Sequence, residues 1–358
     1  MRNKNSKNGT QPKWKALEYS KNQIEKAGSI IKNSNSSTNE IETATLIVDN
    51  WRESHAYPLH VIYIGLRTMF PQYIVAERLK RLDSIINKLK RFSNMSLWTI
   101  QDLGGCRVIV NEIDEVYSCA DKYENSKKRH ILKREYDYIN HPKSSGYRSL
   151  HRVYLFHSDS KNTYNRNMCI EIQYRTHLQH LWATAVETMG LARRESIKTG
   201  QGNDDIKRFF ILISSLFALR ENMPVVPGTS DNIEELVNEI KQINNQNNYL
   251  DMLAGIQVYM DKQDSLIASK SQDGYHILIF NYETRRLRIK YFKPSQSELA
   301  NKTYANIESS RNENKIDAVL VRASSIKGLK IAYPNYFADI HEFIDICLLY
   351  TSDAADDK

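Results

Sequence analysis

The sequence has 358 residues, a formal net charge of +8 at pH 7 and 41% hydrophobic residues. This length is enough for a domain of about 200 residues and a smaller one, and the apolar fraction supplies an ordinary core. No apolar run can span a bilayer and no signal-peptide core is present, so we expect a cytoplasmic protein without membrane contact. The four cysteines are scattered, which excludes a zinc site and a disulfide framework. The basic balance favours a polyanionic partner such as nucleotides or RNA.

The N-terminal third is expected to be helical after a polar start. Residues 1–39 form a polar, partly disordered segment, although helical spacing predicts a first helix over 14–31. A second helix covers 40–70 and is interrupted by Pro58. A strongly basic helix is expected over 72–92, with apolar side chains on one stripe. Its cationic face is either solvated or turned toward a phosphate-bearing ligand, and the helix alone does not decide between these alternatives.

Strands and helices alternate through the rest of the chain, with a break at Pro224 and Pro227. The expected strands are 108–110, 131–138, 150–156, 168–175, 275–281, 286–292 and 317–321, and the expected helices are 112–123, 176–189, 204–220, 232–263, 295–308 and 324–331. The predicted organisation is a domain over 40–225, a helical connector over 226–265, a C-terminal α/β domain over 266–346 and a tail over 347–358. The tail resembles translated sequencing-adapter read-through and is assigned no function.

Two acidic residues are expected at strand positions. Asp102 lies in a glycine-containing loop that leads into a β-branched strand, where it is either a cap or a metal ligand. Glu171 lies in a strand whose residues alternate between apolar and polar. Because side chains alternate across a strand, Glu171, Gln173 and Arg175 share one face, which contacts water or lines a polar site.

The loop over 141–151 combines Pro142, Gly146, cations, histidines and an aromatic residue, and it joins two strands. Lys143 on a glycine turn suits a phosphate-bearing ligand, and an exposed Tyr147 would offer a stacking surface for a base. The simpler interpretation of the same residues is a basic hairpin turn.

Together these polar residues are typical of phosphoryl transfer. Two carboxylates are the minimum for holding Mg²⁺ when substrate phosphates supply the other ligands, and neighbouring cations can neutralise a triphosphate. A carboxylate near the metal can also accept a hydroxyl proton. No Gly-x-x-x-x-Gly-Lys pattern is present, which excludes a Walker-type ATPase.

Four motifs resemble, in order and spacing, the RelA/SpoT nucleotide pyrophosphokinase domain. They are Arg78-x-Lys80 with Ser84-Ile85-x-x-Lys88, then Asp102-x-x-Gly105-x-Arg107, then Pro142-Lys143-x-x-Gly146-Tyr147-x-Ser149-x-His151, then Glu171-x-Gln173-x-Arg175-Thr176. The resemblance implies an α+β fold, with a mixed sheet flanked by helices as in nucleotidyltransferases. It also implies transfer of pyrophosphate from ATP to a ribose 3′-hydroxyl, on GDP or GTP to give (p)ppGpp, or on the 3′ end of tRNA.

The resemblance also implies roles for individual residues. Asp102 would hold Mg²⁺, and Glu171 would complete the metal site or take the proton from the 3′-hydroxyl. On the ATP side, Arg78 and Arg107 would sandwich the adenine, and Lys80, Lys88 and Lys143 would contact phosphates. On the acceptor side, Tyr147 would stack on the base, and His151, Gln173 and Arg175 would line the site. Arg148 stands where the long stringent-response enzymes have an amide, which bears on acceptor preference.

The C-terminal part resembles CapRel-type fused toxin–antitoxin proteins through Tyr333-Pro-Asn-Tyr336 and the run from His180 to Ala185. That resemblance implies that Tyr333 and Tyr336 block the ATP site and that a phage protein relieves the block. The alternative is a proline turn with two packing tyrosines.

Two further expectations concern the class of protein. No His-Asp dipeptide occurs, so the metal-dependent hydrolase of the bifunctional family members is expected to be absent. The alternative to a synthetase is a nucleotide- or RNA-binding module that has lost its chemistry, and the intact acid pair argues against it.

Overall fold

The computed structural model describes residues 14–193, 203–256, 259–260, 273–281, 283–310, 316–323, 326–333, 336–337 and 340–351. The first thirteen residues of the predicted polar segment and residues 352–358 of the predicted tail lie outside these ranges. No helix in the described ranges is long and apolar enough to cross a membrane.

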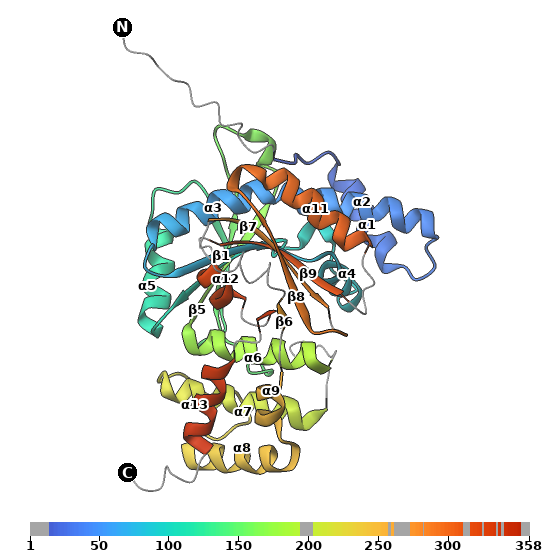
Figure 1. Ribbon diagram of the computed structural model, residues 1–358. Coiled ribbons are helices and arrows are strands. Elements are labelled where there is room, and N and C mark those ends of the chain that lie inside the picture. The colour runs from blue at the N-terminus through green and yellow to red at the C-terminus, as the bar shows by residue number, and fades with distance from the viewer. Residues whose placement is uncertain are drawn as a thin grey trace.

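Three helices precede the first strand; the third lies on the upper face of the sheet, and the first two pack beside it at the sheet's side (Figure 1). They are α1 (Lys21–Lys32), α2 (Thr38–Ser54) and α3 (Ala56–Met69). Ser20 and Ser37 each form a capping box, which satisfies free N–H groups at the first turns of α1 and α2. The predicted interruption near Pro58 is confirmed, because α2 ends before His55 and the proline stands in the first turn of α3, where it removes no helical hydrogen bond.

The predicted basic helix over 72–92 is wrong in its first half. Ile74–Leu79 is a strand, β1, and only Leu82–Arg91 forms the helix α4. β1 pairs with a strand on each side, and this tertiary pairing overrides the local helical pattern. The apolar stripe survives in α4, where Ile85 and Leu89 are fully buried.

Nine strands of the described residues form one mixed sheet in the order β3-β4-β5-β2-β1-β9-β7-β8-β6. Their bounds are β2 (Gly104–Val110), β3 (Ile131–Asp137), β4 (Leu150–Leu155), β5 (Cys169–Thr176), β6 (Tyr259–Met260), β7 (Gly274–Asn281), β8 (Arg286–Phe292) and β9 (Ile316–Ala323). β2 and β5 run parallel, as do β6 and β8, and the other neighbours are antiparallel. The predicted α+β class with a mixed sheet and flanking helices is confirmed. The C-terminal strands extend this sheet through the pair β1–β9.

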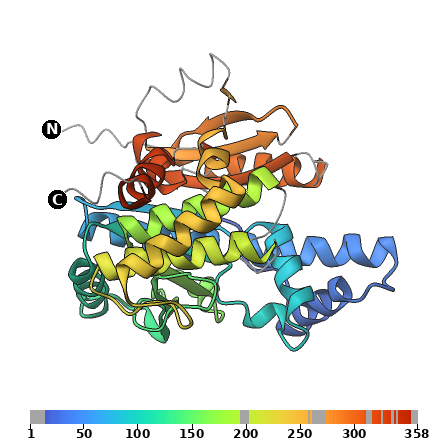
Figure 2. The ribbon, with the colours of Figure 1, turned by 90° about the horizontal axis from the view of Figure 1, so that it is seen from below.

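Helices cover both faces and one end of the sheet (Figures 1 and 2). They are α5 (Ile113–Glu124), α6 (His177–Arg193), α7 (Asp204–Arg220), α8 (Ile233–Asn247), α9 (Tyr249–Ala254), α11 (Ser297–Ser310), α12 (Ile326–Ala332) and α13 (His341–Thr351). α11 lies above the sheet beside α3, and α6 to α9 with α13 form a separate layer below it. α12 packs on the lower face, against β1 and β9.

The predicted long helix over 232–263 is wrong. Asn248 adopts a left-handed conformation (φ 55°) and separates α8 from α9, and asparagine tolerates this region better than most residues. Residues 259–260 form β6, and residues 257–258 and 261–263 of the predicted helix lie outside the described ranges.

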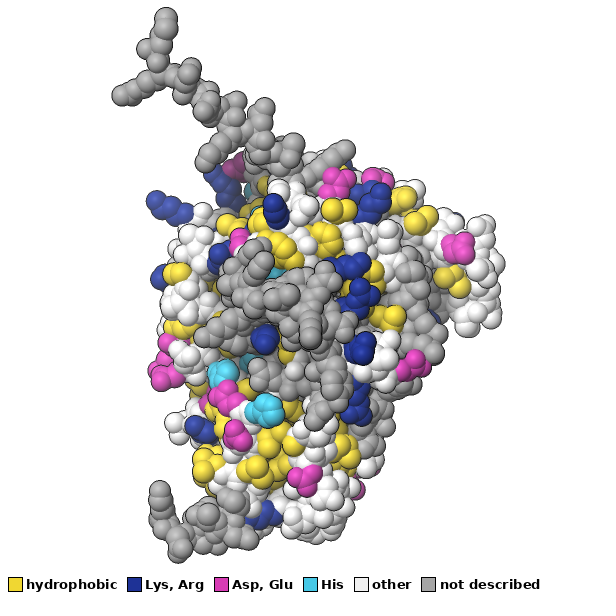
Figure 3. All heavy atoms as spheres, in the orientation of Figure 1, with side chains coloured by type: hydrophobic (Ala, Val, Ile, Leu, Met, Phe, Trp, Pro, Cys, Tyr) yellow, Lys and Arg dark blue, Asp and Glu magenta, His cyan; other side chains and the backbone are white. Residues whose placement is uncertain are grey.

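α13 was not predicted, because its residues adjoin and enter the stretch interpreted as a tail. Phe343 packs on Phe210 and Phe217 of α7, and Cys347 is buried in the same cluster. On the face seen in Figure 3, apolar side chains gather over the lower helices. Leu348 and Leu349 of α13 and Met252 of α9 are exposed.

Two ion pairs join the C-terminal segment to α2 and to the start of α4. Arg52 Nη1 of α2 lies 2.7 Å from Glu308 Oε2 of α11, and both side chains are almost fully buried. The other oxygen of Glu308 accepts a hydrogen bond from the backbone N–H of Leu82, the first residue of α4. Arg81 forms a second ion pair with Asp317 of β9. The C-terminal segment therefore neutralises two arginines and anchors the start of α4.

Removing Glu308 would take away the more deeply buried acidic partner of Arg52 and leave it with Asp49, whose Oδ1 lies 3.0 Å from Arg52 Nη2. We expect Glu308→Ala to lower the free energy of unfolding by about 3–5 kcal/mol, the usual cost of breaking a buried ion pair from one side. Urea denaturation measures this, and Lys302→Ala, an exposed change on the same helix, should stay within about 0.5 kcal/mol of the parent. Equal stability of the two variants would contradict the ascribed role of the pair.

Candidate functional site

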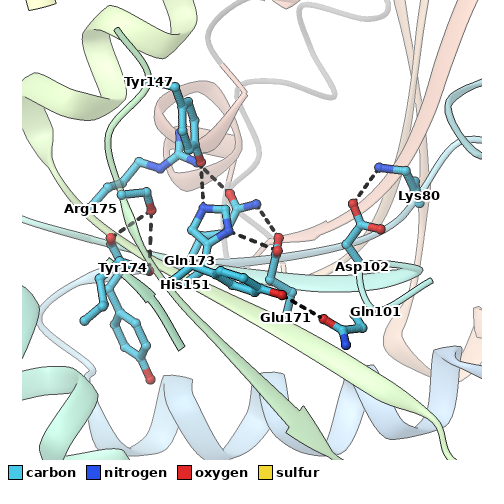
Figure 4. Close-up of polar contacts among 12 residues, drawn as sticks. Lys80, Gln101, Asp102, Tyr147, His151, Glu171, Gln173, Tyr174 and Arg175 are labelled. Atoms are coloured by element: carbon cyan, nitrogen blue, oxygen red, sulfur yellow. Dashed lines mark hydrogen bonds and ion pairs between the residues drawn. The ribbon is translucent and has the colours of Figure 1, made fainter. Parts of the chain in front are cut away.

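The polar side chains gather on the lower face of the sheet, between it and α6 (Figure 4). Strand register places Tyr136 of β3, His151 of β4, Gln173 of β5 and Arg107 of β2 in one row across four strands. The predicted alternation in β5 is confirmed: Ile170, Ile172 and Tyr174 are buried in the core, while Glu171, Gln173 and Arg175 point into this site.

Asp102 lies just before β2 and is held by two lysines. Its Oδ2 is 2.8 Å from Lys80 Nζ, and its Oδ1 is 2.9 Å from Lys88 Nζ. Lys80 follows β1, so it reaches the site from a strand end rather than from the predicted helix, whereas Lys88 comes from α4. Burial alone would raise the pKa of Asp102, but the two ammonium groups hold it below its usual value. The carboxylate is therefore ionised at neutral pH.

Glu171 is the second ionised acid of the site. Its Oε1 lies 3.0 Å from His151 Nδ1, and its Oε2 accepts a hydrogen bond of 2.7 Å from Gln173 Nε2. Burial opposes ionisation, but the charge and hydrogen bond of His151, the Gln173 amide and Lys80 hold the pKa of Glu171 far below its usual range. Burial would likewise lower the pKa of His151, and the Glu171 carboxylate together with Tyr147 raises it to about 9. His151 is therefore charged at neutral pH.

Tyr147 closes this network, but it is not the exposed residue that the sequence predicted. Its side chain is 5% exposed and packs in the cluster with Leu181 and Trp182. Its hydroxyl lies 2.8 Å from His151 Nε2 and accepts a hydrogen bond of 3.0 Å from Arg175 Nη2. Arg175 also donates to Gln173 Oε1 at 2.6 Å. The preceding glycine has a positive φ of 85° and no room for a Cβ, which fixes the turn that buries Tyr147.

Arg148 points away from this network. Its guanidinium donates to the carbonyl oxygens of Ile139 at 3.0 Å and Pro224 at 2.6 Å and to the Ser214 hydroxyl at 3.2 Å. It therefore ties the glycine loop to α7 and to the segment that follows it. The expectation that Arg148 bears on acceptor preference gains no support from this position.

Three arginines converge next to the acid pair. Arg107 of β2 is half-buried, and desolvation together with the charges of Arg175 and Arg78 lowers its pKa to about 10. Within the described part of the chain, the Nε of Arg107 and the Nε and Nη1 of Arg175 are buried without a hydrogen-bond partner. Unsatisfied guanidinium groups that repel one another are favourable only when an anion or an aromatic ring compensates them, so this corner suits a nucleotide.

The C-terminal segment covers this corner. Arg107 Nη1 donates to the carbonyl oxygen of Ala332 at 2.7 Å, and its guanidinium lies 5.7 Å from the centroid of the Tyr333 ring. The Tyr333 hydroxyl donates to the Glu77 carbonyl oxygen at 3.3 Å. Tyr336 instead donates to Asp317 Oδ2 at 2.7 Å, away from Arg107. Of the two predicted blocking tyrosines, Tyr333 contacts an arginine assigned to ATP.

The donor set fits Mg²⁺ bound together with phosphates. No group of three His, Cys, Asp or Glu that could hold a metal occurs among the described residues. Asp102 and Glu171 nevertheless supply two ionised carboxylates, and Mg²⁺ is typically held by one or two carboxylates, with substrate phosphates and water completing its octahedron.

Two aromatic residues of this face were missed from the sequence. Tyr136 and Tyr138 were interpreted only as strand residues, although Tyr136 stands opposite His151 and the Lys143 ammonium lies 4.1 Å from the centroid of the Tyr138 ring. Side chains alternate along β3, and Tyr136 and Tyr138 fall on the same face as His151 of β4. This alternation was the sequence signal that could have identified both tyrosines.

The structure is thus a mixed sheet that carries two acids, Asp102 and Glu171, next to a cluster of arginines. Comparison with known proteins adds to this description. Residues 77–192 match the family model described as "Region found in RelA / SpoT proteins". The matched region includes all the predicted site residues except Tyr333 and Tyr336.

Two curated relatives from Bacillus subtilis (strain 168) match this region. GTP pyrophosphokinase YjbM is 30% identical over 129 residues, which are 34% of this chain and 60% of the relative. GTP pyrophosphokinase YwaC is 35% identical over 115 residues, which are 30% of this chain and 52% of the relative. The chain thus spans less than two thirds of each. The small alarmone synthetase 1 from Bacillus subtilis bound to its product pppGpp matches with 24% identity and a TM-score of 0.40, covering 48% of this chain and 89% of that one.

The raised pKa of His151 predicts a pH-dependent stability. The favourable interaction is fully present below the unfolded-state pKa of about 6.5 and is lost as pH rises through about 9. We expect the free energy of unfolding to fall over this window by up to about 3 kcal/mol more in the parent than in His151→Gln. Denaturant titrations at pH 6.5, 8 and 9.5 measure this difference, with His157→Gln as an exposed control. Parallel pH profiles of parent and His151→Gln would contradict it.

Proposed function

We propose that this protein is an ATP-dependent pyrophosphokinase. The acceptor 3′-hydroxyl oxygen attacks the β-phosphorus of ATP, the bond between that phosphorus and the α,β-bridging oxygen breaks, and AMP leaves. The acceptor is a guanine nucleotide, giving (p)ppGpp, or the 3′ end of tRNA. The observation that carries the proposal is the ionised pair Asp102 and Glu171 beside two lysines and an arginine corner, within the segment that matches RelA/SpoT proteins.

The cations provide the ATP side. Arg78 and Arg107 would hold the adenine, because a planar guanidinium stacks on a ring. Lys80 and Lys88 neutralise Asp102 in this structure, and both would turn to the phosphates when a nucleotide brings its own charge. Lys143, on the glycine loop, would meet the phosphates from the other side. Lys80 and Lys88 would each exchange one anionic partner for another, so they would stay paired with negative charge.

The two acids would hold Mg²⁺. When bound, Mg²⁺ neutralises the charge of the triphosphate and makes the β-phosphorus easier to attack. For Glu171 the metal role is better supported than the role of general base. A base works best when its pKa lies near the working pH, and the pKa of Glu171 is held far below that by His151 and Gln173.

The acceptor side is formed by the network around His151. Charged His151 fixes Glu171 through Nδ1 and Tyr147 through Nε2, and Arg175 fixes Gln173 and Tyr147. These hydrogen bonds hold side chains from β4 and β5 in one orientation, which suits positioning of a hydroxyl group.

We further propose that the C-terminal segment inhibits the enzyme. Tyr333 and the Ala332 carbonyl occupy Arg107, so adenine and Tyr333 would compete for one guanidinium. A phage protein that binds the C-terminal segment would release it, as the resemblance to fused toxin–antitoxin proteins implies. The released enzyme would act as a toxin in phage defence.

The alternative function is a nucleotide- or RNA-binding module without chemistry. It is favoured only by the lysines that occupy both oxygens of Asp102. Binding of ATP without release of AMP in the presence of GDP, GTP or tRNA would support it.

We expect Asp102→Asn and Glu171→Gln to lower pyrophosphate transfer at least about 100-fold, because each removes a carboxylate charge that would hold Mg²⁺ at the triphosphate. The assay follows label from ATP labelled at the β-phosphate into GDP, GTP or total tRNA, offered separately. Asp204→Asn, a fully exposed change, should transfer like the parent. Unchanged transfer by either acid variant would refute the assignment.

We expect Tyr333→Ala to lower the KM for ATP by about tenfold, because it removes a ring that covers Arg107. Steady-state kinetics measure this, and Phe337→Ala on the same segment is the control. A point variant is the sharper test than truncation, because truncation would also remove the partners of Arg52 and Arg81. A KM for ATP that does not change would contradict the inhibitory contact.

A further inference from the structure

We propose that the C-terminal segment builds part of the ATP site as well as covering it. Two of its acids, Glu308 of α11 and Asp317 of β9, are positioning residues for the lysines that hold Asp102. The side chains of both acids are almost fully buried, and they act through other residues and not on ATP itself. This inference rests on the proposed function, because these lysines would meet the phosphates of ATP. Both acids lie outside residues 77–192, the region that matches RelA/SpoT proteins.

The connection from β1 to α4 is held by the C-terminal segment. Arg81, which stands between the two elements, pairs with Asp317, and the Tyr336 hydroxyl donates to Asp317 Oδ2 at 2.7 Å. The next backbone N–H, that of Leu82, donates to Glu308 Oε1 at 3.2 Å. The Arg81 side chain makes no capping hydrogen bond, so Glu308 supplies from another element an acceptor for the first turn of α4. Its negative charge also suits the N-terminal end of a helix.

The two lysines at Asp102 stand on either side of this connection. Lys80 directly precedes Arg81, and its ammonium lies 2.8 Å from Asp102 Oδ2. Lys88 stands in the last turn of α4, and its ammonium lies 2.9 Å from Asp102 Oδ1. A displacement of the connection would move Lys80, and a tilt of α4 about its start would move Lys88. One short stretch of chain therefore sets the position of both ammonium groups.

Apolar packing alone does not fix α4 in this position. The buried side of α4, formed by Ile85 and Leu89, packs in the core with the N-terminal helices. Hydrophobic contacts are non-directional, whereas hydrogen bonds to a charged group specify distance and direction. Arg52 of α2 binds Oε2 of Glu308 at 2.7 Å, which holds the carboxylate so that Oε1 faces the N–H of Leu82. The orientation of α4 is thus fixed by polar contacts to α11.

The C-terminal segment would then have two opposite effects on the enzyme. Tyr333 and the end of α12 cover Arg107 and would hinder ATP, whereas α11 and β9 support the lysines that ATP needs. Loss of the whole segment would remove the inhibitory contact and the support together. An activated enzyme therefore has to keep α11 and β9 in place.

The test breaks one ion pair from its two sides in the full-length protein. Glu308→Ala removes the pair and the acceptor for Leu82, whereas Arg52→Ala removes the pair and leaves Glu308 with its hydrogen bonds from Leu82 and the Tyr304 hydroxyl. We expect Glu308→Ala to lower kcat/KM for ATP at least about tenfold, because misplaced phosphate-binding groups impair transfer strongly. Arg52→Ala should stay within about threefold of the parent, and the KM for the acceptor should change less than about twofold in both variants.

Two further variants keep the test decisive if Glu308→Ala does not fold, which thermal unfolding reveals. Glu308→Gln retains an oxygen that can accept from Leu82, and its kcat/KM for ATP should be at least about threefold higher than that of Glu308→Ala. Asp317→Asn keeps the volume of the side chain but removes the charge that faces Arg81, and it should raise the KM for ATP at least about threefold.

Binding measured by calorimetry provides a second readout. A non-hydrolysable ATP analogue should bind Glu308→Ala and Asp317→Asn more weakly than the parent. AMP should bind all variants alike, because it lacks the phosphates that the lysines would contact.

Equal losses of kcat/KM in Glu308→Ala and Arg52→Ala would indicate a general loss of structure and overturn the inference. A parent-like KM for ATP in Asp317→Asn, or AMP binding weakened as much as analogue binding, would also overturn it. A parent that binds the analogue but transfers no pyrophosphate to GDP, GTP or tRNA would refute the proposed function, and the binding comparison would still decide whether the two acids position the lysines. A parent that binds neither nucleotide would overturn both.

Discussion

The parallel pairing of β2 with β5 is the constraint on which the site depends. Its register places Gly105 beside Glu171 and Arg107 beside Gln173. Asp102 therefore lies close enough to Glu171 for the charge of Glu171 to raise the pKa of Asp102. Both acids stay ionised only because nearby cations compensate this repulsion. Lys80, Lys88 and His151 supply that compensation from three other elements. A register shift of one residue would turn Glu171 into the core and the apolar residues of β5 into the site.

β1 connects this site to the C-terminal segment. It pairs with β2 along its whole length and with β9 at Glu77 and Arg78. Arg78, one of the two arginines proposed to hold adenine, therefore stands where the two parts of the sheet meet. The ion pairs of Arg52 and Arg81 hold α11 and β9 against α2 and α4. Separating the segment as a whole would break both ion pairs, including the buried pair of Arg52 and Glu308, whereas moving Tyr333 and Ala332 would remove only contacts of Arg107. A release mechanism that displaces α12 and leaves β9 in place is physically the less costly one.

Sequence reasoning found the polar face of β5 because alternation is a local property, and it found Asp102 because glycines mark the loop before β2. It could not find that Tyr147 is buried, since that depends on α6 and α7, which are distant in sequence. The basic helix was wrong in its first half for a related reason: the helical stripe runs from Leu79 to Leu89, but pairing with β2 and β9 decides the conformation of Ile74–Leu79. The long helix was wrong because Asn248 adopts a left-handed backbone conformation, which the spacing of apolar residues does not predict. The polar side chains of the site were thus predictable where they followed the two-residue period of a strand. The burial of Tyr147, which depends on helices distant in sequence, was not predictable.

The arginine corner explains why a covering segment and a nucleotide would exclude each other. Desolvation lowers the pKa of Arg107, and the nearby charges of Arg175 and Arg78 lower it further. The Ala332 carbonyl and the Tyr333 ring offset part of that cost in this structure, as an adenine and its phosphates would in a complex. Since both compensate the same guanidinium groups, the binding of one weakens the binding of the other by the same factor in each direction. Under the proposed function, the affinity for ATP and the affinity of the C-terminal segment for its own sheet would be linked quantities, and a protein that binds the segment would change the first by acting on the second.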